Sequence, residues 1–258
     1  MTANIKINCS IKEAMIFAAG IGNRMRYKTK YKAKPLIKVN NKELLDINLD
    51  RLSLVGIRNC IINTSHRHLS VKKFIKRYQS RNKYPKINIA HEKERLETGG
   101  GFKNALKYFH TNNILLINGD SILLNNLTEC PIKNLSNNFL PHKMDILLLL
   151  SSIHNSVGYT GNGDYVKEFQ GMPACIKRKS YFANRNKALI FTGWQIINKR
   201  ILNNFTLKKF SLNQAYDLAE KNNRLYGVTH NGTFLHLSTP KSLIQVQKYL
   251  KHNKVSLL

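Results

Sequence analysis

Acidic residues are scarce in this chain. Its 258 residues include 14 Asp and Glu but 42 Lys and Arg, which gives a formal net charge of +28. Such an excess is typical of proteins that bind nucleic acids. The cations are spread along the whole chain, however, and no RNP, zinc-finger or basic-zipper signature accompanies them. We therefore expect no specific nucleic-acid partner and interpret most of the charge as compositional background.

Cysteine is also rare, and the four thiols lie far apart in the sequence, at Cys9, Cys60, Cys130 and Cys175. The absence of a C-x-x-C pair argues against a zinc ribbon and a redox centre. A disulfide scaffold is not expected at this length. Reduced thiols are the default, so we expect a cytoplasmic protein.

Long apolar runs are missing as well. The first twelve residues are polar and lack the hydrophobic segment of a signal peptide. The longest apolar run, Met144–Ile153, contains Asp145 and two serines. It has about half of the roughly 20 residues that a membrane helix needs. This run is typical of a buried strand, and we expect no membrane contact.

The overall composition is that of a globular protein, with 42% hydrophobic and 22% charged residues. Apolar runs alternate with helix-like stretches, and no repeat or linker interrupts them. The first half predicts strands near residues 14–19, 60–62, 87–89 and 114–117, and helices near residues 43–54, 70–78 and 102–109. Repeated β-α units of this kind predict a mainly parallel sheet, with ligands outside the carboxyl ends of its strands.

A glycine turn follows the first predicted strand, in the stretch Phe17–Met25. Such a turn lets backbone N–H groups approach phosphate oxygens closely. A dinucleotide fingerprint would place a third glycine where Met25 stands, so an NAD-dependent oxidoreductase is disfavoured. Arg24 instead offers a guanidinium that can grip phosphate oxygens. The pattern favours a nucleoside triphosphate.

Three later motifs strengthen this interpretation. Pro35 biases Lys34 toward an extended backbone that can direct its charge into a cleft. The run Glu94–Gly101 ends in three glycines, which indicates crowding by a flat base or a ribose. Asp120, after the fourth strand, can hold Mg²⁺ against substrate phosphates.

Together these motifs resemble the sugar-1-phosphate nucleotidyltransferase family. The strand followed by Ala-Ala-Gly-x-Gly-x-Arg-Met, then Lys-Pro-Leu, Leu-x-Thr-Gly-Gly-Gly and Asn-Gly-Asp occur in the family's order and spacing. The form Leu96–Gly101 is most similar to the short subgroup that includes N-acetylmuramate-1-phosphate uridylyltransferases and mannose-1-phosphate guanylyltransferase-like proteins. Weaker matches at Gly163-Asp164 and Phe191–Gly193 extend the resemblance over most of the chain.

The resemblance implies a Rossmann-like three-layer α/β/α sandwich with a mainly parallel mixed sheet, the nucleotide-diphospho-sugar transferase fold. Residues 1–12 would be an N-terminal extension and 13–258 a single domain. Its nucleotide-binding half would span about 13–125 and its sugar-phosphate-binding half about 126–258. The implied partners are a nucleoside triphosphate and a sugar 1-phosphate, in a monomer or homodimer.

The resemblance also implies a role for individual residues. Arg24, Lys34 and Asp120 would be catalytic. The nucleotide would contact Ala18, Ala19, Gly20, Gly22, Arg24, Lys34, Thr98, Gly99 and Asn118. The sugar phosphate would lie beside Gly163, Asp164, Thr192 and Gly193. Asp120 would bind Mg²⁺, with Mn²⁺ as an alternative. UTP and an N-acetylmuramate-1-phosphate-like sugar are favoured, and GTP with mannose 1-phosphate is the alternative.

The sequence departs from the family near the C-terminus. The family has Trp-x-Asp-x-Gly-Thr, whose Asp is a second metal ligand, where this chain has Phe234–Thr239 with His236 at the Asp position. Imidazole suits softer metals than Mg²⁺. A strand residue without a metal role is the slightly favoured interpretation of His236. Weakened activity, use of Mn²⁺, or a nucleotide-binding relic without turnover all stay open.

Overall fold

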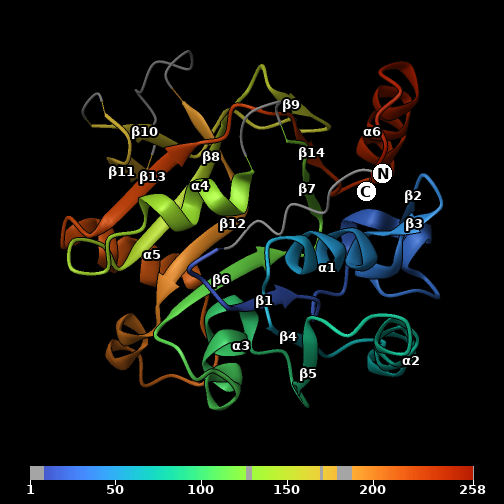
Figure 1. Cartoon of the computed structure of the whole chain (residues 1–258), viewed down its shortest axis with the longest axis horizontal. Helices are drawn as coiled ribbons and strands as arrows, with labels where there is room; N and C mark the ends of the chain where they lie inside the picture. The colour runs from blue at the N-terminus through green and yellow to red at the C-terminus, as the bar shows by residue number, and fades with distance from the viewer. Residues whose placement is uncertain (1–8, 126–129, 169–170, 179–187, 258) are drawn as a thin grey trace.

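Four strands from the first half of the chain form one side of a nine-stranded mixed sheet (Figure 1). They run parallel in the spatial order β5-β4-β1-β6. Their bounds are Glu13–Phe17 for β1, Asn59–Thr64 for β4, Lys86–His91 for β5 and Asn113–Asn118 for β6. This computed structural model describes residues 9–125, 130–168, 171–178 and 188–257.

Strands from the second half complete the same sheet. β12 lies antiparallel between β6 and β8 and joins the two halves. The bounds are Ile146–Ser152 for β8, Tyr165–Lys167 for β10, Ala174–Arg178 for β11, Leu189–Asn198 for β12 and Leu225–Thr229 for β13.

Helices cover both faces of the sheet because strand residues alternate between two cores. In β1, Ala14 and Ile16 belong to one core, while Met15 belongs to the other. The helices on the first face are α1 (Leu44–Leu54), α2 (His68–Gln79) and α4 (Pro131–Asn138). Those on the second are α3 (Glu97–Ala105) and α5 (Leu212–Lys221). The expected three-layer α/β/α fold is confirmed.

A third, smaller core lies beside the sheet. Its helix α6 (Pro240–His252) packs on a three-stranded sheet of β7 (Ser121–Leu123), β14 (Phe234–His236) and β9 (Ser156–Val157). Thr239 and Ser242 form a reciprocal capping box at the start of α6. The short elements are β2 (Lys38–Val39), β3 (Lys42–Glu43), η1 (Asn23–Thr29), η2 (Lys34–Leu36), η3 (Leu106–Tyr108) and η5 (Lys199–Asn204).

One predicted helix begins earlier than expected. The sequence placed it at 102–109, after the glycine run, whereas α3 starts at Glu97 and includes all three glycines. The backbone N–H groups of Gly99 and Gly100 both donate to the carbonyl of Phe210. This carbonyl satisfies amides that a helix start leaves unpaired, which helps glycines to adopt the helical backbone.

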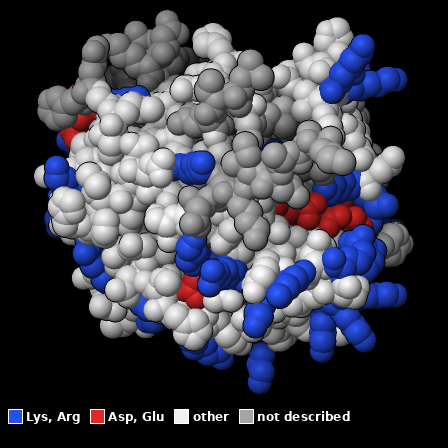
Figure 2. All heavy atoms as spheres, in the orientation of Figure 1, with Lys and Arg blue, Asp and Glu red and all other residues white. Residues whose placement is uncertain are grey.

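Figure 2 shows lysine and arginine side chains on several separate parts of the visible face, with a few acidic groups between them. Within the described residues, no helix is both long and apolar enough to cross a bilayer.

Candidate active site

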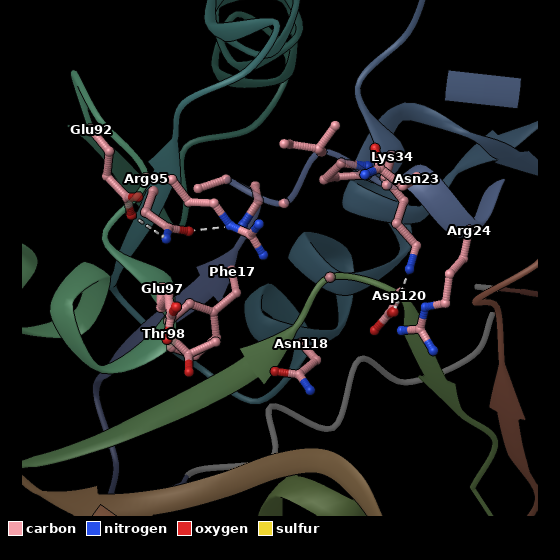
Figure 3. Close-up of a pocket in the computed structure, with 18 of the residues that line it drawn as sticks. Phe17, Asn23, Arg24, Lys34, Glu92, Arg95, Glu97, Thr98, Asn118 and Asp120 are labelled. Carbon is pink, nitrogen blue, oxygen red and sulfur yellow. Dashed lines mark hydrogen bonds and ion pairs between the residues drawn. The ribbon is translucent and has the colours of Figure 1, made fainter. Parts of the chain in front are cut away.

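A cavity of about 490 Å³ opens at the carboxyl ends of β1, β4 and β6. The predicted residues that line it are Ala18, Ala19, Gly20, Gly22, Arg24, Lys34, Thr98, Asn118 and Asp120. Figure 3 shows Asn23, Arg24, Lys34 and Asp120 at one end, and Glu92, Arg95, Glu97 and Thr98 at the other. The cavity therefore has a mainly cationic end and a second end rich in hydrogen-bonding groups.

The two glycines of the turn after β1 serve different purposes. Gly22 has φ +75, and a Cβ there would lie 2.9 Å from Cγ2 of Thr29. Gly20 has no heavy atom within 4 Å of a Cβ position and faces open space in the cavity. Gly22 thus allows the left-handed turn, while Gly20 leaves room for a ligand against the backbone.

Lys34 and Asp120 form an ion pair at the cationic end, with 2.5 Å between Nζ and Oδ2. Burial alone would raise the pKa of Asp120, but the charges of Lys34, His236 and Arg24 bring it below its ordinary value. Asp120 is therefore ionised at neutral pH. The carboxylate of Asp120, which can bind a metal, and the ammonium group of Lys34, which can bind phosphate, are therefore in direct contact.

His236 lies in β14, opposite Ser121 in the β7–β14 ladder, and close enough to Asp120 for their charges to interact. Burial lowers the pKa of His236, and Asp120 only partly offsets this. Its Nδ1 is buried and lacks a hydrogen-bond partner among the described residues. Tyr159 and Phe234 pack around the ring, each with its centroid 5.8 Å away.

The donor set at this end fits Mg²⁺ through Asp120 alone. Mg²⁺ is commonly held by one or two carboxylates together with substrate phosphates. No group of three or more His, Cys, Asp and Glu side chains in the described part of the chain could hold a metal. Any metal here would rely on substrate phosphates and water for its other ligands.

The glycine run before Phe102 is crowded by protein, not by a base or ribose as the sequence suggested. A Cβ at Gly99 would overlap the ring of Phe210, and one at Gly100 would overlap the carbonyl of Lys208. Gly99 is accordingly buried and does not line the cavity. Thr98 does line it, and its Oγ1 accepts a hydrogen bond from Leu212 N at 3.0 Å.

Six polar side chains that line the cavity were missed by the sequence reasoning: Asn23, Asn63, Glu92, Arg95, Glu97 and Ser211. Asn63 is the penultimate residue of β4, and Glu92 directly follows β5. Both strands end at the same edge as β1, so the strand-end rule that singled out Asp120 also indicates these two positions. Arg95 and Glu97 stand beside the Thr98 motif itself.

The four residues expected at the sugar phosphate are not among the described residues that line this cavity. Asp164 Oδ2 accepts from Phe191 N at 2.9 Å. Thr192 is buried, and its hydroxyl donates to Leu149 O at 2.8 Å. Gly193 has φ +82, and a Cβ there would lie 2.7 Å from the side chain of Asn118. Their role at the sugar phosphate stays a prediction.

The fold is that of the nucleotide-diphospho-sugar transferases. A UDP-glucose pyrophosphorylase complexed with UDP-glucose superposes with a TM-score of 0.77 at 14% identity, covering 94% of this chain and 99% of the other. The model of the nucleotidyl transferase family matches residues 13–148. The chain belongs to this family.

Two curated relatives are similar over most of their length. N-acetylmuramate alpha-1-phosphate uridylyltransferase of Caulobacter vibrioides is 28% identical over 240 residues, covering 93% of this chain and 97% of the relative. D-glycero-alpha-D-manno-heptose 1-phosphate guanylyltransferase of Aneurinibacillus thermoaerophilus is 29% identical over 244 residues, covering 93% and 99%. The resemblance to sugar-1-phosphate nucleotidyltransferases is confirmed, and the chain is an enzyme of that class.

Proposed function

We propose that this enzyme joins UTP to an N-acetylmuramate-1-phosphate-like sugar and releases pyrophosphate. An oxygen of the sugar phosphate attacks the α-phosphorus in line, and the bond to the bridging oxygen of the β-phosphate breaks. The convergence of Arg24, Lys34 and Asp120 beside the open face of Gly20 is the observation that best supports this. Positioning and charge neutralisation are the main contributions a protein makes to such transfers.

Each end of the cavity has a defined part in this proposal. Arg24 and Lys34 hold the triphosphate oxygens, and the turn at Gly20 and Gly22 brings backbone close to them. Asp120 holds Mg²⁺, which neutralises charge that develops on the phosphates when it is bound. Thr98 and Asn118 contact the nucleoside. Lys34 pairs with Asp120 in this structure, and we propose that Lys34 turns from Asp120 to the triphosphate when the nucleotide binds, which would leave Asp120 able to hold Mg²⁺.

The base and sugar follow from similarity alone. The relative from Caulobacter vibrioides carries a uridylyltransferase name, and the Leu96–Gly101 form favours the same group. The similarly matched relative from Aneurinibacillus thermoaerophilus supports a second candidate, transfer of guanylate to a mannose-type or heptose-type sugar 1-phosphate. A cytoplasmic location and a monomer or homodimer remain part of the proposal.

The test is pyrophosphate release from UTP, GTP, CTP, ATP and dTTP, each paired with N-acetylmuramate, mannose and heptose 1-phosphates, with Mg²⁺ or Mn²⁺. We expect the highest kcat/KM for UTP with the muramate sugar. The Asp120→Asn variant is the control for contaminating activity. Release with GTP alone would select the second candidate, and tight nucleotide binding without release would indicate a relic.

A further inference from the structure

Four polar groups along the wall of the cavity form a buried network of hydrogen bonds. The backbone N–H of Ala18 donates to Oδ1 of Asn63 at 2.8 Å, and Nδ2 of Asn63 donates to Oε1 of Glu92 at 2.7 Å. Leu96 N donates to the second oxygen of Glu92 at 3.2 Å. Figure 3 shows the bonds from Glu92 as far as the turn after β1. Ala18, Asn63 and Glu92 are each at most 3% exposed.

The hydrogen-bond network lies where the backbone pairing between β1 and β4 ends. Phe17 is the last residue of β1 and pairs with Asn63 of β4. Ala18 then leaves the ladder toward the glycine turn, so its buried N–H needs another acceptor. The Asn63 side chain supplies one. The direction in which the turn leaves the strand is therefore fixed by a side chain rather than by the sheet.

The residue types match the donors and acceptors that this hydrogen-bond network requires. A backbone N–H only donates and an ionised carboxylate only accepts, so the group between them must accept on one side and donate on the other. A side-chain amide does both. Space is reserved as well, because a Cβ at Gly101 would lie 2.6 Å from Oε1 of Glu92 and 2.9 Å from Nδ2 of Asn63.

Glu92 is tied to the other end of the cavity. Its backbone N–H extends the β4–β5 ladder to Thr64 O, and its carboxylate holds Leu96 N at the start of α3. Burial raises the pKa of Glu92, and the bonds from Asn63 and Leu96 oppose this by favouring the charged form. Both carboxylate oxygens thus have protein partners in this structure.

We propose that Asn63 and Glu92 are positioning residues, which hold the turn at Ala18 at a fixed distance and orientation from segment 95–98. The triphosphate at the turn and the base at segment 95–98 can then be bound at the same time. This rests on the proposed function, because it assumes that the cavity binds a nucleoside triphosphate. The pair acts through the backbone of Ala18 and Leu96. A displacement of about 1 Å at such a site can reduce turnover by roughly 10²-fold.

The experiment exchanges the side-chain amide of Asn63 and the carboxylate of Glu92 between the two positions. Asn63→Asp places two carboxylates against each other, and Glu92→Gln leaves the neighbouring amide donors short of an acceptor. In the double variant, the new aspartate accepts from Ala18 N and from the amide of the new glutamine, whose carbonyl oxygen accepts from Leu96 N. Every hydrogen bond returns with the same net charge. We expect each single variant to lose about tenfold or more in UTP affinity and kcat/KM, and the double variant to return within about threefold of wild type.

Binding is measured by calorimetry, turnover by pyrophosphate release, and folding by the thermal midpoint. Asn198→Asp is the matched control, because Asn198 is a buried asparagine with a side-chain bond to Asn113 at 2.9 Å, outside the cavity lining. It should lower the midpoint and leave UTP affinity unchanged. If Asn63→Asp does not fold, the double variant alone must recover both fold and affinity.

The results separate the possible failures. A double variant that folds but stays as weak as the single variants would overturn the positioning role. A change of more than about tenfold in its UTP-to-GTP preference would show that Glu92 reads the base directly, which also overturns the proposal. Failure of the wild type to bind any nucleoside triphosphate would overturn this proposal and the proposed function together.

Discussion

The two halves of the sheet use their motif residues in different ways. In the first half, the predicted residues Arg24, Lys34 and Asp120 line one cavity, with Lys34 and Asp120 paired to each other. In the second half, Thr192 and Gly193 face inward, toward Leu149 and Asn118. The short motifs of the first half therefore line a cavity, whereas Thr192 and Gly193 of the second half contact other protein groups.

The largest difference between the halves should appear at Asp120. We expect Asp120→Asn to reduce kcat/KM by about 10²- to 10³-fold, because the neutral amide no longer balances Lys34 or binds a hard cation. Pyrophosphate release at saturating Mg²⁺ measures this. The thermal midpoint is measured as a control for folding and should fall, because the mostly buried Lys34 loses its charged partner. Activity within about tenfold of wild type would remove Asp120 from the catalytic role.

Two glycines allow a direct comparison between a position that faces the cavity, Gly20, and a position packed against protein atoms, Gly101. Gly20→Ala should fold normally because its Cβ meets no atom within 4 Å, yet lose roughly 10- to 100-fold in UTP affinity because the methyl group enters the cavity.

Gly101→Ala is the counterpart, since an alanine in a helix ordinarily stabilises by about 0.5–1 kcal/mol. Here its Cβ would meet Glu92 and Asn63, so we expect a lower free energy of unfolding in urea. Equal affinity loss in both variants without a stability difference would contradict this division.

His236 tests whether the two halves share a metal site. His236→Asp adds a second carboxylate close to Asp120, so the variant should be less stable than wild type in EDTA and gain thermal stability with Mg²⁺. We expect about a tenfold lower Mg²⁺ concentration for half-maximal activity.

His236→Asn is the matched control, because it offers an amide oxygen without the charge. Unchanged Mg²⁺ dependence in His236→Asp, measured by both unfolding and turnover, would show that this position does not limit turnover.

Sequence reasoning succeeded where chemistry depends on local pattern. The strand-turn sequence at Phe17–Met25 and the strand-end Asp120 predicted the edge at which the cavity lies. Sequence reasoning failed where the contacts of a residue come from residues distant in the sequence. The glycines before Phe102 are crowded by Lys208 and Phe210, which are distant in the sequence, and no local pattern indicates that contact. The partners of Asn63 are likewise fixed only by the order of strands in the sheet.

The smallest expected effect on activity is at Thr192. It tests whether this residue of the second half contacts the sugar phosphate or only other protein groups. Thr192→Val keeps the shape of the side chain but removes the hydroxyl that donates to Leu149 O. Removing the hydroxyl that donates to Leu149 O and accepts from Trp194 N in a buried site should cost about 1–3 kcal/mol of unfolding free energy in urea. The KM for the sugar phosphate should stay within about twofold, because the hydroxyl contacts protein rather than ligand. Thr192→Ser, which restores the donor, should recover part of the stability. A KM raised about tenfold or more with unchanged stability would mean that Thr192 turns toward the sugar phosphate when substrate binds, and the contrast between the two halves would then disappear.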